Sequence, residues 1–168
     1  TVWRCYERMS AGILYIVATP IGNIDDISAR AIEVLGAVDV IAAEDTRHSK
    51  LLLNRLGISN KLVAYHDHND EYVSAKFIES LSEGQSIALI SDAGTPLISD
   101  PGYKLVKLAR ELGISVLPIP GASAITAALS VAGLPTDRFC FEGFLPAKTA
   151  AREQRLANLS KESRTLVF

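Results

Sequence analysis

Acidic and histidine side chains gather in three short segments, each directly after an apolar run. They are Glu44 and Asp45 after residues 38–43, the stretch His66-Asp67-His68 after residues 62–65, and Asp92 and Asp100 after residues 87–90. Carboxylates and imidazoles accept and donate protons, so the pattern predicts proton transfer or polar ligand binding. Metal binding is not predicted, because three ligands on consecutive residues are poorly spaced for a tetrahedral site and no cysteine partner is evident.

Proline and glycine concentrate after three of the apolar runs. We name these segments, by the run that each follows, the first loop (residues 19–23), the fourth loop (91–102) and the fifth loop (118–123). They hold Pro20, Pro96, Pro101, Pro118 and Pro120, together with Gly22, Gly94, Gly102 and Gly121. Proline fixes φ and glycine admits positive φ, so such loops have set backbone shapes and let a ligand come close. Turn chemistry alone explains any one of them, but three on one rim favour a binding site.

The missing motifs narrow the class of ligand. The chain has no G-x-x-x-x-G-K-[ST] phosphate loop and no G-x-G-x-x-G after its first strand-like run. Glu44 and Asp45 lie about 20 residues beyond Gly22, where a dinucleotide site keeps its ribose-binding acid, but one glycine of three is a weak signal. The three loops hold no lysine or arginine to bind a pyrophosphate. They suit an uncharged or cationic nucleoside better than a polyphosphate.

Alternating strand-like and helix-like segments must position these loops. The strand-like runs are residues 13–18, 38–43, 62–65, 87–90 and 116–119, and the helix-like stretches are residues 28–35, 49–56, 71–81, 103–112 and 122–131. Five strand–helix pairs predict an α/β fold with a mostly parallel five-stranded sheet flanked by helices. All carboxyl ends of a parallel sheet meet at one edge, where ligands of open α/β sheets bind.

Several residues predict where the helices begin and end. Gly36, Gly57, Gly84 and Gly113 stand where helix-ending glycines belong. For the helix starts, Asp70 is the expected cap of the third helix, and Asp25 and Asp26 are the expected caps of the first.

The chain is expected to hold one whole domain and the beginning of another. We place an N-terminal extension at residues 1–11, with Met9 as the natural start and residues 1–8 added ahead of it. An N-terminal α/β domain is expected at residues 12–134. Residues 135–168 are expected to be a linker and the truncated beginning of a C-terminal domain. The apolar stretch 164–168 predicts a strand whose partner follows it.

Composition excludes several classes of protein. The 168 residues carry a net charge of −2, from 17 basic and 19 acidic side chains, with 48% hydrophobic residues. This balance excludes disorder and the electrostatic capture of nucleic acid by a strongly basic domain. Two cysteines predict a reducing compartment, so we expect a cytoplasmic protein, and no apolar run reaches the length of a membrane span.

Six segments resemble one family. They are V-A-T-P-I-G-N-I-D-D-I-S, A-A-E-D-T-R-H-S, H-D-H-N, S-D-A-G-T-P-L-I-S-D-P-G, P-G-A-S-A and L-P-T-D-R-F-C-F-E-G-F-L-P. The chain from about Gly12 to Phe168 resembles the ribosomal small-subunit RNA 2′-O-methyltransferase I family of tetrapyrrole-methylase-like (class III) enzymes. The resemblance implies two α/β domains, S-adenosylmethionine as cofactor in the cleft between them, a homodimer, and 2′-O-methylation of a cytidine in 16S-type rRNA.

The resemblance also implies roles for residues. The expected cofactor contacts are Pro20, Asp92, Ala93, Gly94, Thr95, Ile98, Ser99, Asp100, Gly121, Ala122 and Ser123. For contact with rRNA or the ribosomal subunit we predict Arg47, His68, Lys148 and Arg152. Arg47, Lys148 and Arg152 come from two basic groups for which a solvated helix face is the competing interpretation, and His68 comes from the H-D-H-N segment. For deprotonation of the ribose hydroxyl we predict His66 or Asp45, which both follow strand ends.

Three alternatives stay open. A methylase of the same superfamily could act on a tetrapyrrole or another small molecule, although the E-D-T-R and H-D-H-N segments favour the RNA branch by resemblance. A nucleotide-dependent oxidoreductase would use the same kind of sheet, but the glycine fingerprint is missing. A non-catalytic RNA-binding or dimerisation module would also keep the fold, although nothing in the loops looks decayed.

Overall fold

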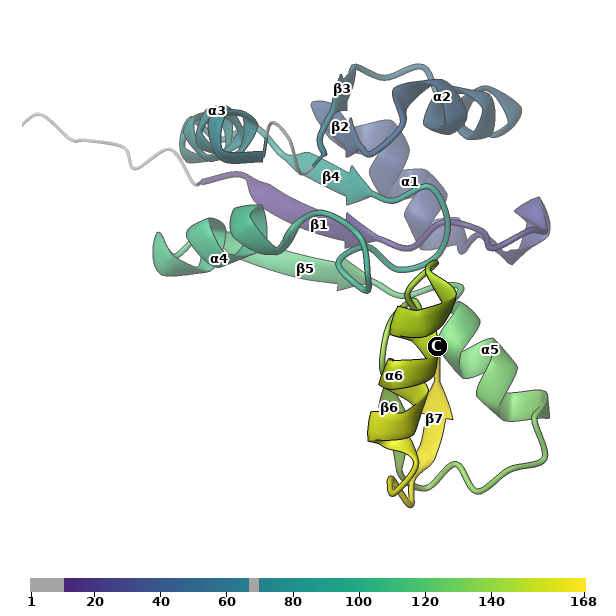
Figure 1. Ribbon diagram of the computed structural model, residues 1–168. Helices are drawn as coiled ribbons and strands as arrows, with labels where there is room; N and C mark the ends of the chain where they lie inside the picture. The colour runs from purple at the N-terminus through teal and green to yellow at the C-terminus, as the bar shows by residue number, and fades with distance from the viewer. Residues whose placement is uncertain (1–10, 67–69) are drawn as a thin grey trace, which may run out of the picture. The chain divides into compact units, whose positions relative to one another are not determined.

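A five-stranded sheet forms the centre of the first part of the chain. The computed structural model describes residues 11–66 and 70–168 and divides into two compact units, one ending at Ala122 and the other running from Ser123 to Phe168. The strands of the first unit are β1 Ile13–Val17, β2 Val40–Ala43, β3 Leu62–Ala64, β4 Ile87–Ile90 and β5 Ser115–Ile119. All pair in parallel, in the order β3-β2-β4-β1-β5, and Figure 1 shows β1, β4 and β5 pointing the same way. This confirms the predicted fold class.

Burial follows the place of each strand in the sheet. Every residue of β2 and β4 is buried, whereas the edge strand β3 is half-buried and the other edge strand, β5, is mostly exposed. Strands covered on both faces consist almost entirely of apolar residues, as the sequences VIAA and IALI show here. The buried centre therefore fixes the strand ends from which the loops start.

Helices cover the two faces in pairs. The helices are α1 Ala29–Ala37, α2 Thr46–Arg55, α3 Asp70–Ser82 and α4 Tyr103–Glu111. Residues of α1 and α2 share a core cluster with Ile41 and Ile90, and residues of α3 and α4 share another with Leu14 and Leu89. The chain therefore leaves β1 toward one face and the neighbouring β4 toward the other. Such a reversal between adjacent strands opens a crevice at their carboxyl ends.

Four of the predicted helix boundaries were wrong. Helix α3 begins at Asp70 itself, which was the expected cap ahead of that helix. Gly36 lies inside α1, which continues to Ala37, whereas Gly57, Gly84 and Gly113 have the positive φ of helix-ending glycines. The cap of α1 is Ser28, whose Oγ accepts from Ala31 N at 3.1 Å.

The other two corrections concern acidic residues placed at helix starts. Asp25 and Asp26 lie in a separate 3₁₀ turn, Ile24–Asp26, that precedes α1. Helix α2 begins at Thr46 rather than at residue 49, because Asp45 caps it. Arg47 and His48 therefore belong to the first turn of α2 and not to a loop.

The second unit is a small α/β arrangement. It comprises α5 Ala124–Val131, β6 Phe139–Phe141, α6 Thr149–Leu159 and β7 Thr165–Val167. Strand β7 confirms the strand predicted at the end of the chain, but its partner in the structure is β6, which precedes it and pairs with it in parallel. The expected domain boundary near residue 134 stays a prediction, and of the expected extension 1–11 only Ala11 lies within the described residues. No described helix is long and apolar enough to cross a membrane.

Two glycines give a matched test of backbone shape. Gly102 has φ +136 at the start of α4, and a Cβ there would lie 2.8 Å from Leu89 Cδ2, so we expect Gly102→Ala to cost about 1–3 kcal/mol of unfolding free energy. Gly36 lies in a helix with open space around it, so Gly36→Ala is expected to gain about 0.5–1 kcal/mol. Urea unfolding of both variants checks the two signs, and a neutral Gly102→Ala would contradict this account of the fourth loop.

Candidate active site

Backbone hydrogen bonds join the first, fourth and fifth loops. Thr19 N donates to Gly94 O at 2.9 Å and Gly94 N donates to Thr19 O at 3.1 Å, so the first and fourth loops form a short antiparallel bridge. Ala18 N donates to Ile119 O at 3.2 Å. Thr95 Oγ1 donates to Ala122 O at 3.3 Å, which links the fourth loop to the fifth. The predicted convergence of the three loops is confirmed, and we call this joined surface the loop cradle.

The cradle depends on unusual backbone geometry. Gly94 has φ 83, and the non-glycine residues Leu97 and Ser99 have φ 72 and 65. Positive φ at a residue with a side chain costs of the order of 1–3 kcal/mol and is concentrated at functional sites. At Gly121 an added Cβ would lie 3.0 Å from Ala18 Cβ, so a side chain there would crowd the first loop.

Two carboxylates of the fourth loop carry its negative charge. Burial raises the pKa of Asp100, the charge of Asp92 adds to this increase, and a hydrogen bond with the Ser91 side chain opposes it. A buried carboxylate beside a second one is stabilised by a nearby cation or by hydrogen-bond donors. The cradle is therefore suited to a positively charged or hydroxyl-bearing ligand.

Asp45 has a clear structural role as the cap of α2. Its Oδ1 accepts from Arg47 N at 2.8 Å and from His48 N at 3.4 Å, and its Oδ2 lies 3.3 Å from Arg47 Nη2. The Arg47 backbone hydrogen bond is the main reason that the pKa of Asp45 is lowered. The backbone N of Asp45 in turn donates to Asp92 Oδ1 at 3.2 Å, which ties α2 to the fourth loop. A catalytic role for Asp45 stays a prediction.

His66 follows the edge strand β3, away from the cradle. The residue is half-buried. Strand β3 is separated from β4 by β2 and from β1 by both β2 and β4. Neighbouring strands lie about 4.8 Å apart, so about 10 Å and 14 Å separate β3 from those two strands. His66 thus follows a strand that is two places from β4 in the sheet, and its role as a base stays a prediction. His68 lies outside the described residues.

A groove of about 450 Å³ adjoins the cradle, within the usual size of a ligand site. The first loop and the residues after it form one wall, α2 forms another, and the fourth loop closes one end. The lining residues are Pro20, Ile21, Gly22, Ile24, His48, Leu51, Leu52, Arg55, Asp92 and Ala93. The predicted helix at residues 49–56 already contained Leu51, Leu52 and Arg55, so the late start of that helix omitted only His48 from the α2 wall. The signal was present in Asp45, a preferred capping residue just ahead of Thr46.

The remaining predicted residues are spread over both units. Arg47 is exposed and paired with Asp45, and Ile98 lies exposed in the fourth loop. In the second unit Ser123 precedes α5, Lys148 is exposed ahead of α6, and Arg152 Nη1 donates to Pro146 O and Ala147 O at 3.4 and 3.1 Å. Arg152 therefore holds the segment before α6, and the predicted RNA contacts stay predictions.

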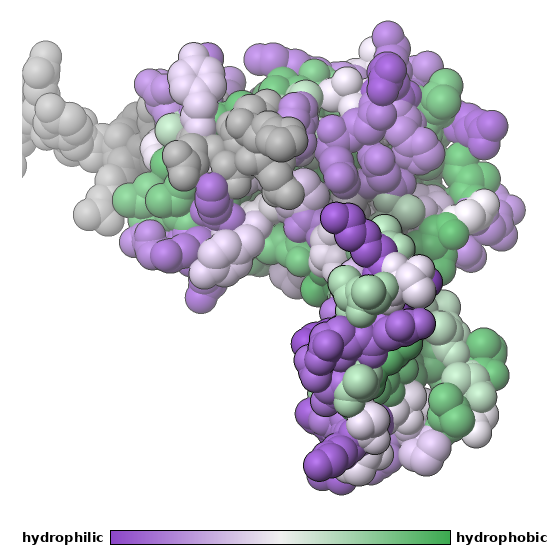
Figure 2. Space-filling model, viewed as in Figure 1, coloured by the Kyte–Doolittle hydropathy of each residue, from purple (hydrophilic) through white to green (hydrophobic). Residues whose placement is uncertain are grey.

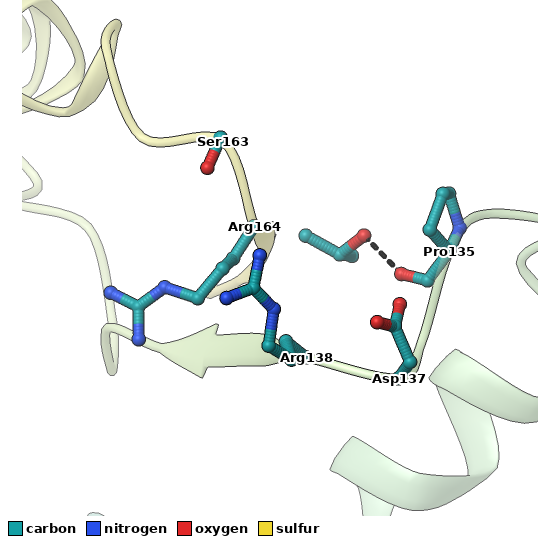
Figure 3. A pocket seen from close by; sticks show the side chains of 6 residues that line it. Pro135, Asp137, Arg138, Ser163 and Arg164 are labelled. Carbon is teal, nitrogen blue, oxygen red and sulfur yellow. Dashed lines mark hydrogen bonds between the residues drawn. The ribbon is translucent and has the colours of Figure 1, made fainter.

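The second unit has a small hollow of its own, about 170 Å³ in volume. Arg138 and Arg164 lie on one side and Pro135 and Asp137 on the other (Figure 3). Arg164 Nη2 lies 2.8 Å from Glu162 Oε2, and its hydrogen bonds lower the pKa of Glu162 to about 2. This arginine is thus already occupied by a carboxylate. Among the described residues no cluster of histidine, cysteine and acidic side chains could hold a metal ion.

The chain is similar to a family of methylases. Residues 13–168 match the family described as tetrapyrrole (corrin/porphyrin) methylases. Two relatives named ribosomal RNA small subunit methyltransferase I are 59% identical over 157 residues, in Haemophilus influenzae, and 60% identical over 159 residues, in Escherichia coli O157:H7. The matches cover 94% and 95% of this chain and 56% of each relative, so the chain spans little more than half their length.

Solved structures show the same fold. Uroporphyrin-III-C-methyltransferase from Thermus thermophilus matches with a TM-score of 0.58 and 24% identity, over 77% of this chain and 59% of that one. Diphthine synthase matches with a TM-score of 0.61 and 21% identity, over 77% of this chain and 52% of that one. At these identities the likeness concerns the fold alone.

Asp100→Asn is expected to stabilise the ligand-free protein near neutral pH. Because burial raises the pKa of Asp100, the folded chain binds more protons than the unfolded chain between the two pKa values, and stability falls as pH rises through that window. The neutral amide removes this loss of stability. The unfolding free energy of the variant should therefore exceed that of the wild type above the window and equal it below the window. Urea unfolding between about pH 3 and pH 7 measures the difference. A less stable variant at neutral pH would contradict the assignment.

Asp45→Ala and Asp45→Asn separate the capping role from a role in proton transfer. Alanine removes the acceptor for Arg47 N and His48 N, so we expect the thermal midpoint to fall by a few degrees, whereas asparagine keeps an acceptor and most of the stability. Because the pKa of Asp45 is lowered, the loss should be complete above the ordinary Asp pKa and shrink as pH falls. Equal midpoints for all three proteins would show that the cap is unimportant.

Proposed function

The chain belongs to the tetrapyrrole (corrin/porphyrin) methylase family, and from this premise we propose that the full-length protein methylates the 2′-hydroxyl of a cytidine ribose in small-subunit ribosomal RNA, with S-adenosylmethionine as methyl donor. The observation that carries the proposal is the 59–60% identity to proteins named ribosomal RNA small subunit methyltransferase I. That identity spans the first, fourth and fifth loops, which the structure joins into the cradle.

The cradle fits the proposed donor. S-adenosylmethionine, when bound, supplies a methyl group on a positively charged sulfur that leaves as a neutral thioether. Asp92 and Asp100 provide negative charge, and a unit positive charge about 4 Å away gains roughly 4 kcal/mol at an effective dielectric near 20. Gly94 is buried, with both main-chain groups bonded to Thr19, whereas Gly121 is exposed in the fifth loop. The cradle lacks lysine and arginine, which agrees with a ligand without phosphates.

The protein's main contribution would be alignment. Holding the ribose hydroxyl in line with the methyl group can lower the activation barrier by roughly 7–11 kcal/mol. The bridge between Thr19 and Gly94 and the bond from Thr95 to Ala122 make the cradle stiff enough for that task.

The proton of the ribose hydroxyl needs an acceptor. Of the two proposed residues, Asp45 has the more favourable position and His66 has the more favourable side-chain chemistry. Asp45 is tied to the fourth loop through Asp92, but its carboxylate is occupied by the helix cap and by Arg47, and its pKa is lowered. His66 has an imidazole, the side chain used most often for general acid–base catalysis, but it follows the edge strand of the sheet. A general base is worth about 10²–10⁴-fold in rate, so substitution decides between them.

The proposal extends to partners and place. We infer that the full-length protein acts as a homodimer on rRNA or the small ribosomal subunit, in the cytoplasm, as the resemblance and the cysteine usage predict. The alternative of a small-molecule methylase has the support of a shared fold with uroporphyrin-III-C-methyltransferase, at 24% identity. The far higher identity to rRNA methyltransferases favours RNA.

Transfer of labelled methyl groups tests the proposal. With tritiated S-adenosylmethionine, we expect the full-length protein to label unmethylated small ribosomal subunits, and nuclease mapping should place the label on a cytidine ribose. His66→Ala and Asp45→Asn are measured at saturating donor, and the true base should show a loss of about 10²–10⁴-fold. Calorimetric binding of NAD without S-adenosylmethionine, or labelling of tetrapyrroles but not subunits, would contradict the proposal. Unchanged rates for both variants would remove both from the proton-transfer step.

A further inference from the structure

Helix α2 is a strongly cationic element on an acidic chain. Its sequence, TRHSKLLLNR, contains Arg47, Lys50 and Arg55 and no acidic residue, whereas the whole chain has a net charge of −2. Figure 2 shows the surface over α2 as mostly hydrophilic, with hydrophobic residues at its margin. Lysine and arginine clustered along one helix are the electrostatic footprint of a nucleic-acid contact.

Residues of α2 line two grooves, and each groove has at least one cationic side chain from this helix. One is the groove already described, lined on the α2 side by His48, Leu51, Leu52 and Arg55. The other, of about 410 Å³, is lined in part by Arg47 and Lys50. Residues three and four apart share one face of a helix, which explains the division. A phosphodiester chain running over α2 would therefore meet positive charge on either side.

The first groove combines features that suit a single nucleotide. Its walls carry apolar side chains, among them Ile21, Ile24 and Leu51, which is 65% exposed. Its α2 wall adds the cationic Arg55, and the fourth loop adds Asp92. An apolar wall accommodates a base, a guanidinium binds a phosphate, and a carboxylate accepts from a ribose hydroxyl but repels a phosphate. The charges would thus orient a nucleotide with its sugar toward the cradle.

We propose that this groove, between α2 and the first and fourth loops, is the subsite for the RNA nucleotide that receives the methyl group, with Arg55 and His48 on its phosphate and Leu51 against its base. The inference rests on the proposed function and names its substrate site. RNA modules that read single strands combine cationic side chains with side chains that contact the bases. In this groove Arg55 is the cationic side chain and Leu51 is the exposed apolar one.

The order of strands separates helix α2 from the fifth loop, which holds part of the expected cofactor contacts. Helix α2 follows β2, on one side of the β4–β1 pair, and the fifth loop follows β5, on the other side. The first and fourth loops lie between them and are shared by both sites. Pro20, Asp92 and Ala93 belong both to the groove lining and to the predicted cofactor set. Donor and acceptor would therefore meet across these two loops.

One hydrogen bond connects the groove wall to the cradle. Asp92 Oδ1 accepts from Asp45 N, and the Asp45 side chain caps α2. This hydrogen bond fixes the start of the cationic helix relative to the fourth loop. This linkage lets a contact made by Arg55, at the far end of α2, align a ribose at the cradle.

Two substitutions in the groove, each with a matched control, test the inference in the full-length protein. Arg55→Gln is compared with Arg110→Gln, because both arginines lie in the last turn of a helix and Arg110 belongs to α4, on the opposite face of the sheet. Leu51→Ala is compared with Leu112→Ala, whose side chain is similarly exposed, at 62%. The readouts are KM for small ribosomal subunits at several salt concentrations and the affinity for S-adenosylmethionine.

We expect Arg55→Gln to raise KM about tenfold and to reduce the slope of log KM against log salt by about one, as loss of one phosphate contact requires. Leu51→Ala should raise KM about threefold and leave the slope unchanged. Both controls and all four cofactor affinities should match the wild type. A 4-thiouridine placed beside the target nucleotide should crosslink to the peptide holding residues 46–55.

The other outcomes overturn the inference in distinguishable ways. If the wild type labels subunits and both groove variants behave as their controls do, the groove is not the nucleotide subsite, while the proposed function stands. If the variants weaken cofactor binding instead, the groove belongs to the donor. If they change only the oligomeric state in light scattering, it is an interface between copies. A wild type that binds the cofactor but labels no subunits refutes the proposed function, and this inference with it.

Discussion

The two hydrogen bonds between Thr19 and Gly94 are the contact on which the whole site depends. Strands β1 and β4 are neighbours, but the chain leaves them toward opposite faces of the sheet. Without a connection, the two loops would diverge and leave main-chain groups unpaired at a buried strand end, which is costly. The bridge satisfies those groups and fixes the floor of the crevice. Thr19 itself is almost fully buried, so the contact is shielded from water.

Backbone strain and buried charge collect around this bridge. Leu97 and Ser99 adopt positive φ, and burial raises the pKa of Asp100. A fold tolerates such features where the surrounding structure holds them and where a bound ligand offsets their cost. The fully buried strands β2 and β4 provide that support. The stable sheet centre and the strained fourth loop are thus two parts of one arrangement.

The site also shows a consistent separation of charge. The carboxylates Asp92 and Asp100 belong to the fourth loop and the cations belong to α2, and the hydrogen bond from Asp45 N to Asp92 connects the two. A positively charged methyl donor would lie near the carboxylates of the fourth loop, and a polyanionic RNA acceptor would lie near the cations of α2. A chain with a net charge of −2 can therefore bind RNA locally, although its composition excludes global attraction.

Much of this arrangement could be predicted from local pattern. The apolar runs gave strands at the expected places because parallel strands buried on both faces have almost no polar residues, and 87–90 matched β4 residue for residue. Proline and glycine marked the three loops because their backbone preferences are intrinsic. The start of α2 was missed because the side chains of its first turn are polar, so that only the cap at Asp45 marks it.

The amino-acid sequence by itself determined which segments are strands, which loops are stiff and which family the chain resembles, since these depend on properties of neighbouring residues. Only the tertiary structure decided the strand order, and with it that the first and fourth loops hydrogen-bond while His66 follows an edge strand. The same holds for the groove, whose walls come from segments up to 73 positions apart, Pro20 to Ala93. The packing of helices on the two faces of the sheet determines which distant segments become neighbours in the groove. This packing involves the whole domain and cannot be deduced from any local stretch of residues.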